Sequence, residues 1–408
     1  MLEKTIECWS LSREMEFMCS LALGEKALSI PQDIDWQKFE ALVDKNRIDP
    51  LVADGLKQFP QEVLRQYPVL EQLYASKNTY SLYSMLQMQT LALVMNAFET
   101  AGIRAISMKG PILAMELYGN PALRYSKDLD VFVSEEDYDR ASEQLEALGF
   151  QESSSVLTKT ALRRQIFEES DEERHLSYVK DDIQIELHWR YSIHINKNFD
   201  ELWGNRCTKV IMGQKINCFG RDDNLVYLIC HAAGHGFCRL RWLFDIYELQ
   251  KASDFSWENV YKKAKETNVA PLIIETMMML YLIPQFGMKN VEYSLFHVSR
   301  NNGKVYLRYM DSMQTDVKRG CGLVHAVYAK IFETGLRREI GIRKYDYYIP
   351  IAGKEKSVFR FISRRFRPCA TELQLIDLPD SLYFLYYIIR PLYKIWQVLP
   401  FSKKSAEK

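Results

Sequence analysis

The sequence predicts an α+β fold: a small mixed β-sheet with helices, flanked by mainly helical regions on both sides. Two observations support this prediction. Residues 103–189 alternate short strand-like runs with helical stretches in the order β-α-β-α-β-β, which is typical of a mixed sheet with helices packed on it. Before and after this segment, apolar side chains recur at helical spacing instead.

Helical patterns dominate the first hundred residues. Apolar side chains follow helical spacing at 36–43, and residues 80–98 are rich in helix formers and contain neither Gly nor Pro. Pro60 and Pro68 interrupt the stretch between them. We therefore expect residues 1–100 to form a helical N-terminal region.

Short strands begin after Gly102. Runs at 103–108, 129–133, 175–179 and 183–189 have strand-like patterns. Pro111 is well placed at the first position of a helix at 112–118, and the polar cap at 134–137 precedes a second helix at 138–148, which ends at Gly149. Residues 101–200 are thus expected to form the α/β core of the chain.

The helical period returns after this core. Helices are predicted at 225–238, 240–251, 257–265 and 270–281, and the pattern beyond Val305 is similar. We expect residues 201–300 to form a helical bundle that completes a cleft with the sheet. Residues 301–408 are expected to be a helical C-terminal region that ends in an aromatic-rich helix.

Composition limits the classes of function. The chain has 408 residues, of which 47% are apolar, and its 53 basic residues balance its 53 acidic ones. Because no net positive charge is available, a general nucleic-acid binder is not expected, and any phosphate chemistry must come from a local site. The eight cysteines form no C-x-x-C pair, and residues 1–20 lack an apolar run typical of a secretory signal. We expect a cytoplasmic protein.

One apolar segment, at 382–401, bears on membrane contact. Arg390 and Pro391 lie at its centre and Lys394 follows, where a charge inside a bilayer would cost several kcal/mol. A kinked helix capped by Asp380 or Ser381 and packed on the protein is therefore expected. An interfacial membrane helix is the lesser alternative, supported by the basic residues between 354 and 367.

The sharpest chemical signal is the segment RYSKDLDVFV at 124–133. Asp128 and Asp130 are two residues apart at the start of a strand, so both side chains project from the same face. Two carboxylates that converge repel each other, and a divalent cation such as Mg²⁺ relieves that repulsion. Exposed aspartates at a loop-to-strand junction are the ordinary alternative.

Four other residues could complete a phosphate site. Lys109 and Gly110 lie between a strand and a helix, where backbone N–H groups and the positive helix end attract anions. Arg124 could bind a phosphate with two hydrogen bonds. Glu186 lies between apolar neighbours on another strand and would be the third carboxylate of a two-metal site. The structural alternatives are an ordinary turn at Lys109-Gly110, a solvated side chain for Arg124 and a sheet-edge ion pair for Glu186.

The sequence resembles the family of uncharacterised nucleotidyltransferases within the DNA polymerase β superfold. The resemblance lies in the order of four motifs: Lys-Gly, Arg-x-x-x-Asp-x-Asp, Glu-Leu-His-Trp and the block HAAGHGFCRLRWLFDI at 231–246. The resemblance spans about residues 36–265. It implies a nucleotidyltransferase core and a Mg²⁺-dependent, or Mn²⁺-dependent, transfer of a nucleoside monophosphate from a nucleoside triphosphate, with ATP the expected donor.

The resemblance also implies roles for single residues. Asp128 and Asp130 would bridge two metal ions, and Glu186 would hold the catalytic one. Lys109, Gly110 and Arg124 would contact the triphosphate. An acceptor hydroxyl or phosphate on a small molecule, a saccharide, a peptide or a protein would attack the α-phosphorus in line, and pyrophosphate would leave. The chain departs from the superfold at Gly110-Pro111, where a Gly-Ser or Gly-Gly pair is usual.

A second group of polar residues is expected to line a substrate cleft. His231 and His235 are four residues apart, a spacing that can bind zinc, but no third ligand is evident. A cleft or a hydrogen-bond network around Asp245 is favoured over metal. His188 shares the strand face of Glu186, and could orient it or bind the acceptor. The cleft candidates are His188, His231, His235, Arg239, Arg241 and Asp245.

Two other functions remain open at this stage. The first is a regulatory module that binds a nucleotide without turnover. The second is kinase-like transfer of the γ-phosphate at the same site. The sequence does not distinguish the nucleobase or the acceptor.

Overall fold

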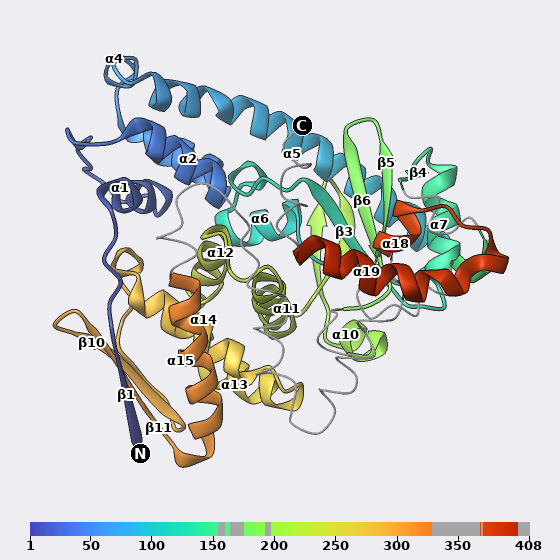
Figure 1. Cartoon of the computed structure of the whole chain (residues 1–408). Coiled ribbons are helices and arrows are strands. Elements are labelled where there is room, and N and C mark those ends of the chain that lie inside the picture. Colours follow the sequence, from blue (N-terminus) through green and yellow to red (C-terminus); the bar gives the residue numbers. More distant parts are fainter. Residues whose placement is uncertain (154–159, 164–174, 192–196, 329–367, 369, 399–408) are drawn as a thin grey trace.

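The computed structural model describes residues 1–153, 160–163, 175–191, 197–328, 368 and 370–398 (Figure 1). This part of the chain contains a seven-stranded mixed sheet, a separate four-stranded sheet and many helices. The predicted α+β class is therefore confirmed. The seven cysteines within the described residues are free thiols.

The seven-stranded sheet carries the candidate site. Its strand order is β4 (Gln151–Glu152), β5 (His175–Lys180), β6 (Ile183–His188), β3 (Asp128–Val133), β2 (Ala105–Ser107), β8 (Gln214–Cys218) and β7 (Cys207–Ile211). β3 runs parallel to β6 and β2 runs parallel to β8, whereas the other neighbours are antiparallel. The four strands expected between 103 and 189 thus form its centre.

The two faces of this sheet pack against different helices. Along β3, Leu129, Val131 and Val133 point into a core that they share with α5 (Pro68–Thr100) and α7 (Tyr138–Ala147). Phe132 points the other way, into the core that contains α11 (Arg221–Gly234). Because successive side chains on a strand alternate between faces, Asp128 and Asp130 lie on the α11 face.

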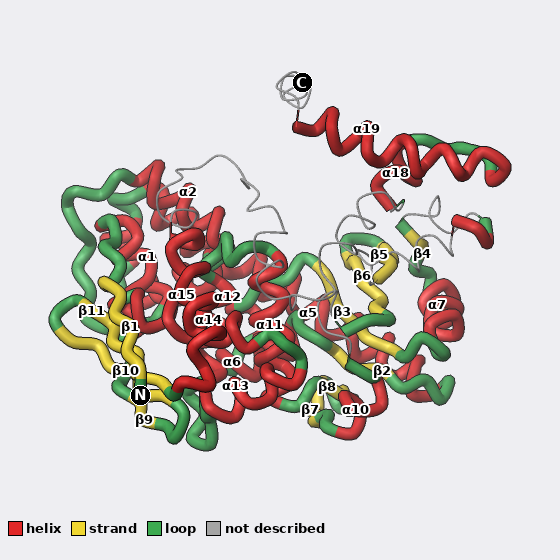
Figure 2. The backbone as a smooth tube through the Cα atoms, turned by 60° about the horizontal axis from the view of Figure 1, so that its bottom comes forward, coloured by secondary structure: helices red, strands yellow, loops and turns green. Residues whose placement is uncertain are grey.

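Helices that precede and follow the α/β core in the sequence form a second, larger hydrophobic cluster (Figure 2). α14 (Ala270–Leu282) is its centre, since every one of its residues is buried. Around it pack helices from both halves of the chain: α1 (Arg13–Ala22), α2 (Trp36–Asn46), α3 (Asp49–Gly55), α12 (Arg241–Leu249), α13 (Trp257–Glu266) and α15 (Gln314–Tyr328). Three further short helices are α4 (Gln61–Leu64), α6 (Pro111–Tyr118) and α10 (Phe199–Gly204).

The four-stranded sheet is a local correction to the mainly helical regions expected at 1–100, 201–300 and 301–408. β1 (Leu2–Glu7) pairs with β11 (Lys304–Tyr309), which pairs with β10 (Phe296–Asn301), which in turn pairs with β9 (Val291–Glu292). β1 buries only Ile6, so this edge strand lacks the apolar alternation that marks a half-buried strand in a sequence.

The β7–β8 hairpin is a further correction within 201–300. Each strand is five residues long, and Met212 and Gly213 both have positive φ in the turn between them. Two such residues form the tight turn that fits the twist of a hairpin. β8 then pairs with β2 and extends the sheet beyond the predicted core.

The C-terminal segment packs on the seven-stranded sheet. Leu373 of α18 (Ala370–Leu375) and Tyr386 of α19 (Tyr386–Val398) are buried in the same core as β3 and β6. Arg390 forms a buried ion pair with Glu372 at 2.9 Å. The helix expected at 382–401 therefore begins at Tyr386, after a 3₁₀ turn at Asp380–Leu385.

No helix in the described part of the chain is both long and apolar enough to cross a membrane. Residues 399–401 of the predicted segment, and the basic residues between 354 and 367, lie outside the described residues. Peripheral membrane contact stays a prediction.

Candidate active site

Two parallel strands bring the three predicted carboxylates to one face. Asp128 and Asp130 are two residues apart on β3, and Asp130 lies beside Glu186 of β6 in the pairing register. Ile183, Ile185 and Leu187 of β6 are buried in the core on the opposite face, so Glu186 projects on the same side as Asp130. The structure thus places these carboxylates as neighbours at the centre of the sheet.

Lys109 contacts this group from the turn after β2. Its Nζ lies 2.9 Å from Oδ1 of Asp130, and both side chains are buried. Gly110 follows at φ 75° and caps α6, with Pro111 at the first helical position. A residue with a Cβ is strained at this positive φ, so the turn that aims Lys109 at Asp130 requires glycine.

Electrostatics separate the carboxylates. Burial raises the pKa of Asp128, and the neighbouring Asp130 raises it further. Burial also acts to raise the pKa of Asp130, but Lys109 and a hydrogen bond to His188 outweigh it and hold that pKa well below its usual value. Asp130 is therefore the fixed anion of the site. Asp128 is the carboxylate whose charged form is disfavoured by its burial and by the neighbouring negative charges.

Lys109 and Glu186 are also held in their charged forms. Burial acts to lower the pKa of Lys109, but the nearby carboxylates, Asp130 foremost, raise it above its usual value. For Glu186, burial acts to raise the pKa, and its hydrogen bond with His188 more than offsets this.

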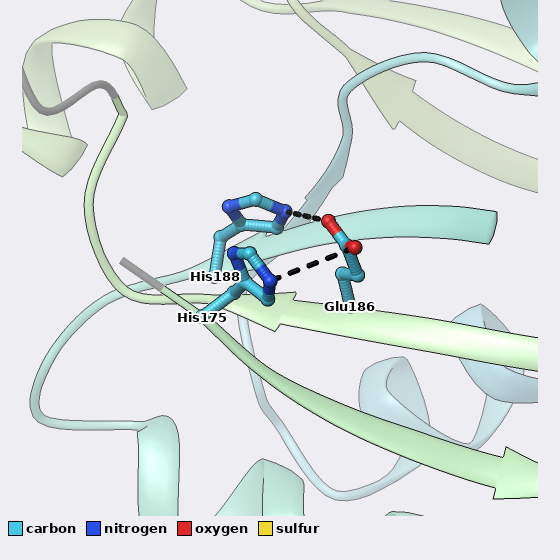
Figure 3. Close-up of side chains that lie close together, drawn as sticks. All are labelled: His175, Glu186 and His188. Atoms are coloured by element: carbon cyan, nitrogen blue, oxygen red, sulfur yellow. Dashed lines mark ion pairs between the residues drawn. The ribbon is translucent and has the colours of Figure 1, made fainter. Parts of the chain in front are cut away.

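Two histidines surround Glu186 (Figure 3). Nε2 of His188 lies 3.4 Å from Oε2 of Glu186 and 3.1 Å from Oδ1 of Asp130. Nε2 of His175 lies 3.5 Å from Oε1, the other oxygen of Glu186. The ligand atoms of His175, Glu186 and His188 all lie within 4.8 Å of one another; in the described part of the chain, Asp128 and Asp130 belong to no such group.

Arg124 contacts the helical side of the site. Its Nε donates to Oδ2 of Asp245 on α12 at 2.9 Å, and both side chains are almost fully buried. Tyr118 completes this group, since its hydroxyl donates to Oδ1 of Asp245 at 3.2 Å. The predicted phosphate ligand Arg124 and the predicted cleft residue Asp245 are therefore partners of each other.

Arg241 adds a second, partly buried guanidinium on the same side. Its NH1 donates to the backbone oxygen of Tyr125 at 2.5 Å. Burial lowers the pKa of Arg241, and Arg124 nearby lowers it further, to about 10. Arg241 also acts on Asp128 electrostatically. Two arginines and one aspartate thus give the helical side a local excess of positive charge.

The other predicted cleft residues gather around Trp242 on α12. His235 stacks on its ring with centroids 5.4 Å apart, and His231 meets it edge-on at 5.9 Å. Arg239 lies over the same ring at 5.6 Å. Neither His231 nor His235 belongs to a group of three or more metal-ligating side chains among the described residues.

Sequence reasoning missed several contacts that hold the loop before β3. Ser126 donates from its hydroxyl to the backbone oxygen of Asp128 at 2.9 Å, and Gln87 of α5 donates to the backbone oxygen of Ser126 at 3.0 Å. Tyr227 of α11 acts electrostatically on Lys109. Only the proximity of Ser126 to Asp128 in the chain was a visible signal; the other contacts join distant segments.

A divalent cation would satisfy one buried atom of the carboxylate group. Oδ2 of Asp130 is buried and has no hydrogen-bond partner among the described residues, although a buried polar atom is normally satisfied. Carboxylate oxygens are the ligands that Mg²⁺ prefers. Asp128, Asp130 and Glu186 are the residues that would hold it.

The family comparison agrees with this fold. The model of the family described as uncharacterised nucleotidyltransferases matches residues 32–282, which include both arginines and all three carboxylates. The chain belongs to this family. No curated protein and no solved structure matches the chain.

Proposed function

We propose that the chain is a Mg²⁺-dependent nucleotidyltransferase, able to use Mn²⁺ in its place, which moves a nucleoside monophosphate from a nucleoside triphosphate to an acceptor hydroxyl or phosphate. The observation that carries this proposal is the register between β3 and β6, which sets Asp130 beside Glu186 with Asp128 on the same face. The family match supports nucleotidyl transfer in general. The identity of the metal, ATP as the donor and the class of acceptor are parts of our proposal.

The three carboxylates would hold the metal, and a bound divalent ion would neutralise charge on the triphosphate. Lys109 keeps Asp130 ionised and in one position through their 2.9 Å contact. His188, two residues after Glu186 on β6, contacts both Asp130 and Glu186 and would hold them in position. Because these partners are already in place, little reorganisation is needed when the substrate arrives.

The triphosphate would lie between the carboxylates and the arginines. NH1 of Arg124 and Nε of Arg241 are buried and have no hydrogen-bond partner among the described residues. Donors of this kind are suited to phosphate oxygens. Gly110 at the start of α6 would let a phosphate approach the backbone, and the positive helix end would favour it.

The acceptor is proposed to be a small molecule, a saccharide, a peptide or a protein rather than nucleic acid. The formal net charge is zero, and a nucleic-acid substrate is usually bound through a strongly basic surface. The cluster of His231, His235 and Arg239 around Trp242 is the proposed acceptor side of the cleft. We expect the reaction to take place in the cytoplasm.

The test uses nucleoside triphosphates labelled separately at the α- and γ-phosphates. Each is incubated with Mg²⁺, the purified full chain and a lysate as the acceptor source. Asp130→Asn should reduce transfer of the α-label by at least about 100-fold, because it removes the fixed anion of the site. Asp182→Asn, an exposed change in the turn between β5 and β6, should leave transfer unchanged.

Other results would overturn the proposal. Transfer of the γ-label alone would show kinase-like chemistry. Nucleotide-dependent thermal stabilisation without transfer of either label would show a binding module. Equal α-label transfer by the wild type and Asp130→Asn would place the chemistry elsewhere in the chain.

A further inference from the structure

The side chains of His175, Glu186 and His188 form a compact group of nitrogen and oxygen donors. β5 and β6 are antiparallel neighbours, and His175 lies directly opposite His188 in their register. Glu186 is two residues before His188, so its side chain projects from the same face. Three donors of two chemical kinds therefore come from two rigid neighbouring strands.

The separations suit a small metal ion. A tetrahedral ion with bonds of about 2.0–2.1 Å holds its donors roughly 3.4 Å apart. The two imidazole-to-carboxylate separations are 3.4 Å for His188 and 3.5 Å for His175, and each imidazole faces a different oxygen of Glu186 (Figure 3). The ligand atoms of the three side chains all lie within 4.8 Å of one another, and the two ring centroids are 4.7 Å apart, so an ion that bound all three would draw the two imidazoles together.

The donor types determine which metal would bind. Imidazole nitrogen suits zinc, copper, iron and nickel, whereas Mg²⁺ prefers oxygen ligands and keeps its waters. The group is also enclosed: the His188 side chain has no exposed surface, and those of Glu186 and His175 are 15% and 26% exposed. A partly open site of this kind can admit an ion and leave a coordination position for a further ligand.

We propose that His175, Glu186 and His188 bind a first-row divalent transition-metal ion of the Zn²⁺ and Co²⁺ type, in preference to Mg²⁺. The site shares Glu186 with the proposed catalytic group but requires neither nucleotide nor transfer. An ion bound there would use Glu186 as a ligand, so Zn²⁺ would compete with the catalytic ion for this carboxylate. Because the histidines come from β5 and β6 and the aspartates from β3, the two sites can be separated by mutation.

The experiment measures metal binding to the full chain after chelator treatment, without nucleotide. Calorimetry with Zn²⁺ gives the affinity, and visible absorption of the Co²⁺ form gives the ligand type. We expect binding of one ion that millimolar Mg²⁺ does not displace. His175→Ala should weaken it by at least about 10-fold, since loss of even an outer partner of a metal ligand costs 10–100-fold.

Two control variants make the result specific. His297→Ala removes a partly buried histidine from β10, in the other sheet, and should bind Zn²⁺ as the wild type does. Asp128→Asn should also keep Zn²⁺ binding while losing α-label transfer, which separates this proposal from the proposed function.

The proposal is overturned if His175→Ala and His297→Ala bind Zn²⁺ equally, or if Mg²⁺ displaces the ion at similar concentration. It is also overturned if the Co²⁺ spectrum shows intense sulfur-to-metal charge transfer, because that band would place the ion on the cysteines.

Discussion

Arg124 and Asp245 are joined by a buried ion pair between residues 121 positions apart in the chain. Their side chains are 2% and 1% exposed, so neither charge can be solvated if the other is removed. Burial acts to lower the pKa of Arg124, yet Asp245 outweighs it and raises that pKa. This pair fixes the loop before β3 to the helical bundle, and with it the position of Asp128.

We predict that Asp245→Asn lowers the free energy of unfolding by about 3–5 kcal/mol, because it leaves the Arg124 charge buried without its partner. Urea unfolding followed by circular dichroism measures this change. The double variant Arg124→Met/Asp245→Leu should recover most of the loss, since it removes both charges and fills the space.

Asp33→Asn is the matched control, because Asp33 pairs with Arg13 at the surface. Exposed pairs of this kind contribute under about 1 kcal/mol. A similar loss in Asp33→Asn and Asp245→Asn would contradict the prediction.

At the residue scale, the sequence identified site residues whose partners lie close to them in the chain. Asp128 and Asp130 were identifiable because their spacing and the apolar residues around them set a strand face. The partner of Arg124 was not, because a contact across 121 residues leaves no local pattern. The role of His175 was not predictable either, because it depends on which strand lies opposite in the sheet.

At the scale of elements, α13 is fixed to the four-stranded sheet by one carboxylate in its first turn. Glu258 accepts hydrogen bonds from Lys262 Nζ and Ser294 Oγ, each at 2.6 Å, and from the backbone N–H of Leu295 at 3.3 Å. These bonds, that from Lys262 foremost, lower the pKa of Glu258 to about 2 from its usual 4.5. The helix and the segment before β10 are thus joined through an ionised side chain.

A depressed pKa gives a stabilisation that is present above the usual pKa and lost as the pH falls. We predict that Glu258→Gln lowers the free energy of unfolding by about 1–2 kcal/mol near neutral pH. The difference from wild type should shrink between pH 4.5 and 2, the window set by the two pKa values. Urea titrations at several pH values measure it.

Glu266→Gln, an exposed change near the end of the same helix, serves as the control and should alter stability by less than about 0.5 kcal/mol. A deficit in Glu258→Gln that persists at full size at pH 2 would show that lost packing, rather than lost charge, is responsible.

Elements rich in apolar residues were predictable from the sequence, and most strands of the second sheet were not. α14 and the strands at the centre of the large sheet are buried on most sides, so their patterns are clear. β1 buries a single residue and shows no alternation. The β10–β11 hairpin did leave a signal, since Asn302 and Gly303 both have positive φ and Asn-Gly is a strong indicator of a hairpin turn.

At the scale of the whole molecule, the C-terminal segment is part of the core beneath the candidate active site. Leu373 of α18 is fully buried with residues of β3, β5 and β6. Leu375, two residues later on the same helix, is 51% exposed. Side chains more than 180 residues after β6 therefore support the sheet that carries Glu186.

We predict that Leu373→Ala lowers the free energy of unfolding by about 2–5 kcal/mol, through the lost apolar burial and the cavity left behind. Because the cavity lies in the sheet core, amide hydrogen exchange of β5 and β6 should accelerate with it.

Leu375→Ala is the control and should change stability by less than about 0.5 kcal/mol. Faster exchange confined to α18 and α19 would show that the C-terminal segment is a separate unit and would contradict the prediction.

The division into regions at 100, 200 and 300 remains a prediction from the sequence. It rests on where strand patterns give way to helical ones. The packing crosses each of these positions: the larger core contains residues from the first hundred and from 202–324, and the sheet core reaches to Tyr386. Contacts between segments so far apart are beyond what local periodicity can indicate.

The pairing of β1 with β11 has a consequence for synthesis of the chain. Leu2 aligns with Tyr309, so β1 must wait for about 300 further residues to be made before its partner exists. At 5–20 residues per second that delay is roughly 15–60 s. During this time β1 offers unpaired backbone groups to other chains, and Glu3, Lys4 and Glu7, which are exposed in the finished sheet, provide the charges that discourage such pairing. The second sheet thus closes only after the strands that carry the candidate active site have been made.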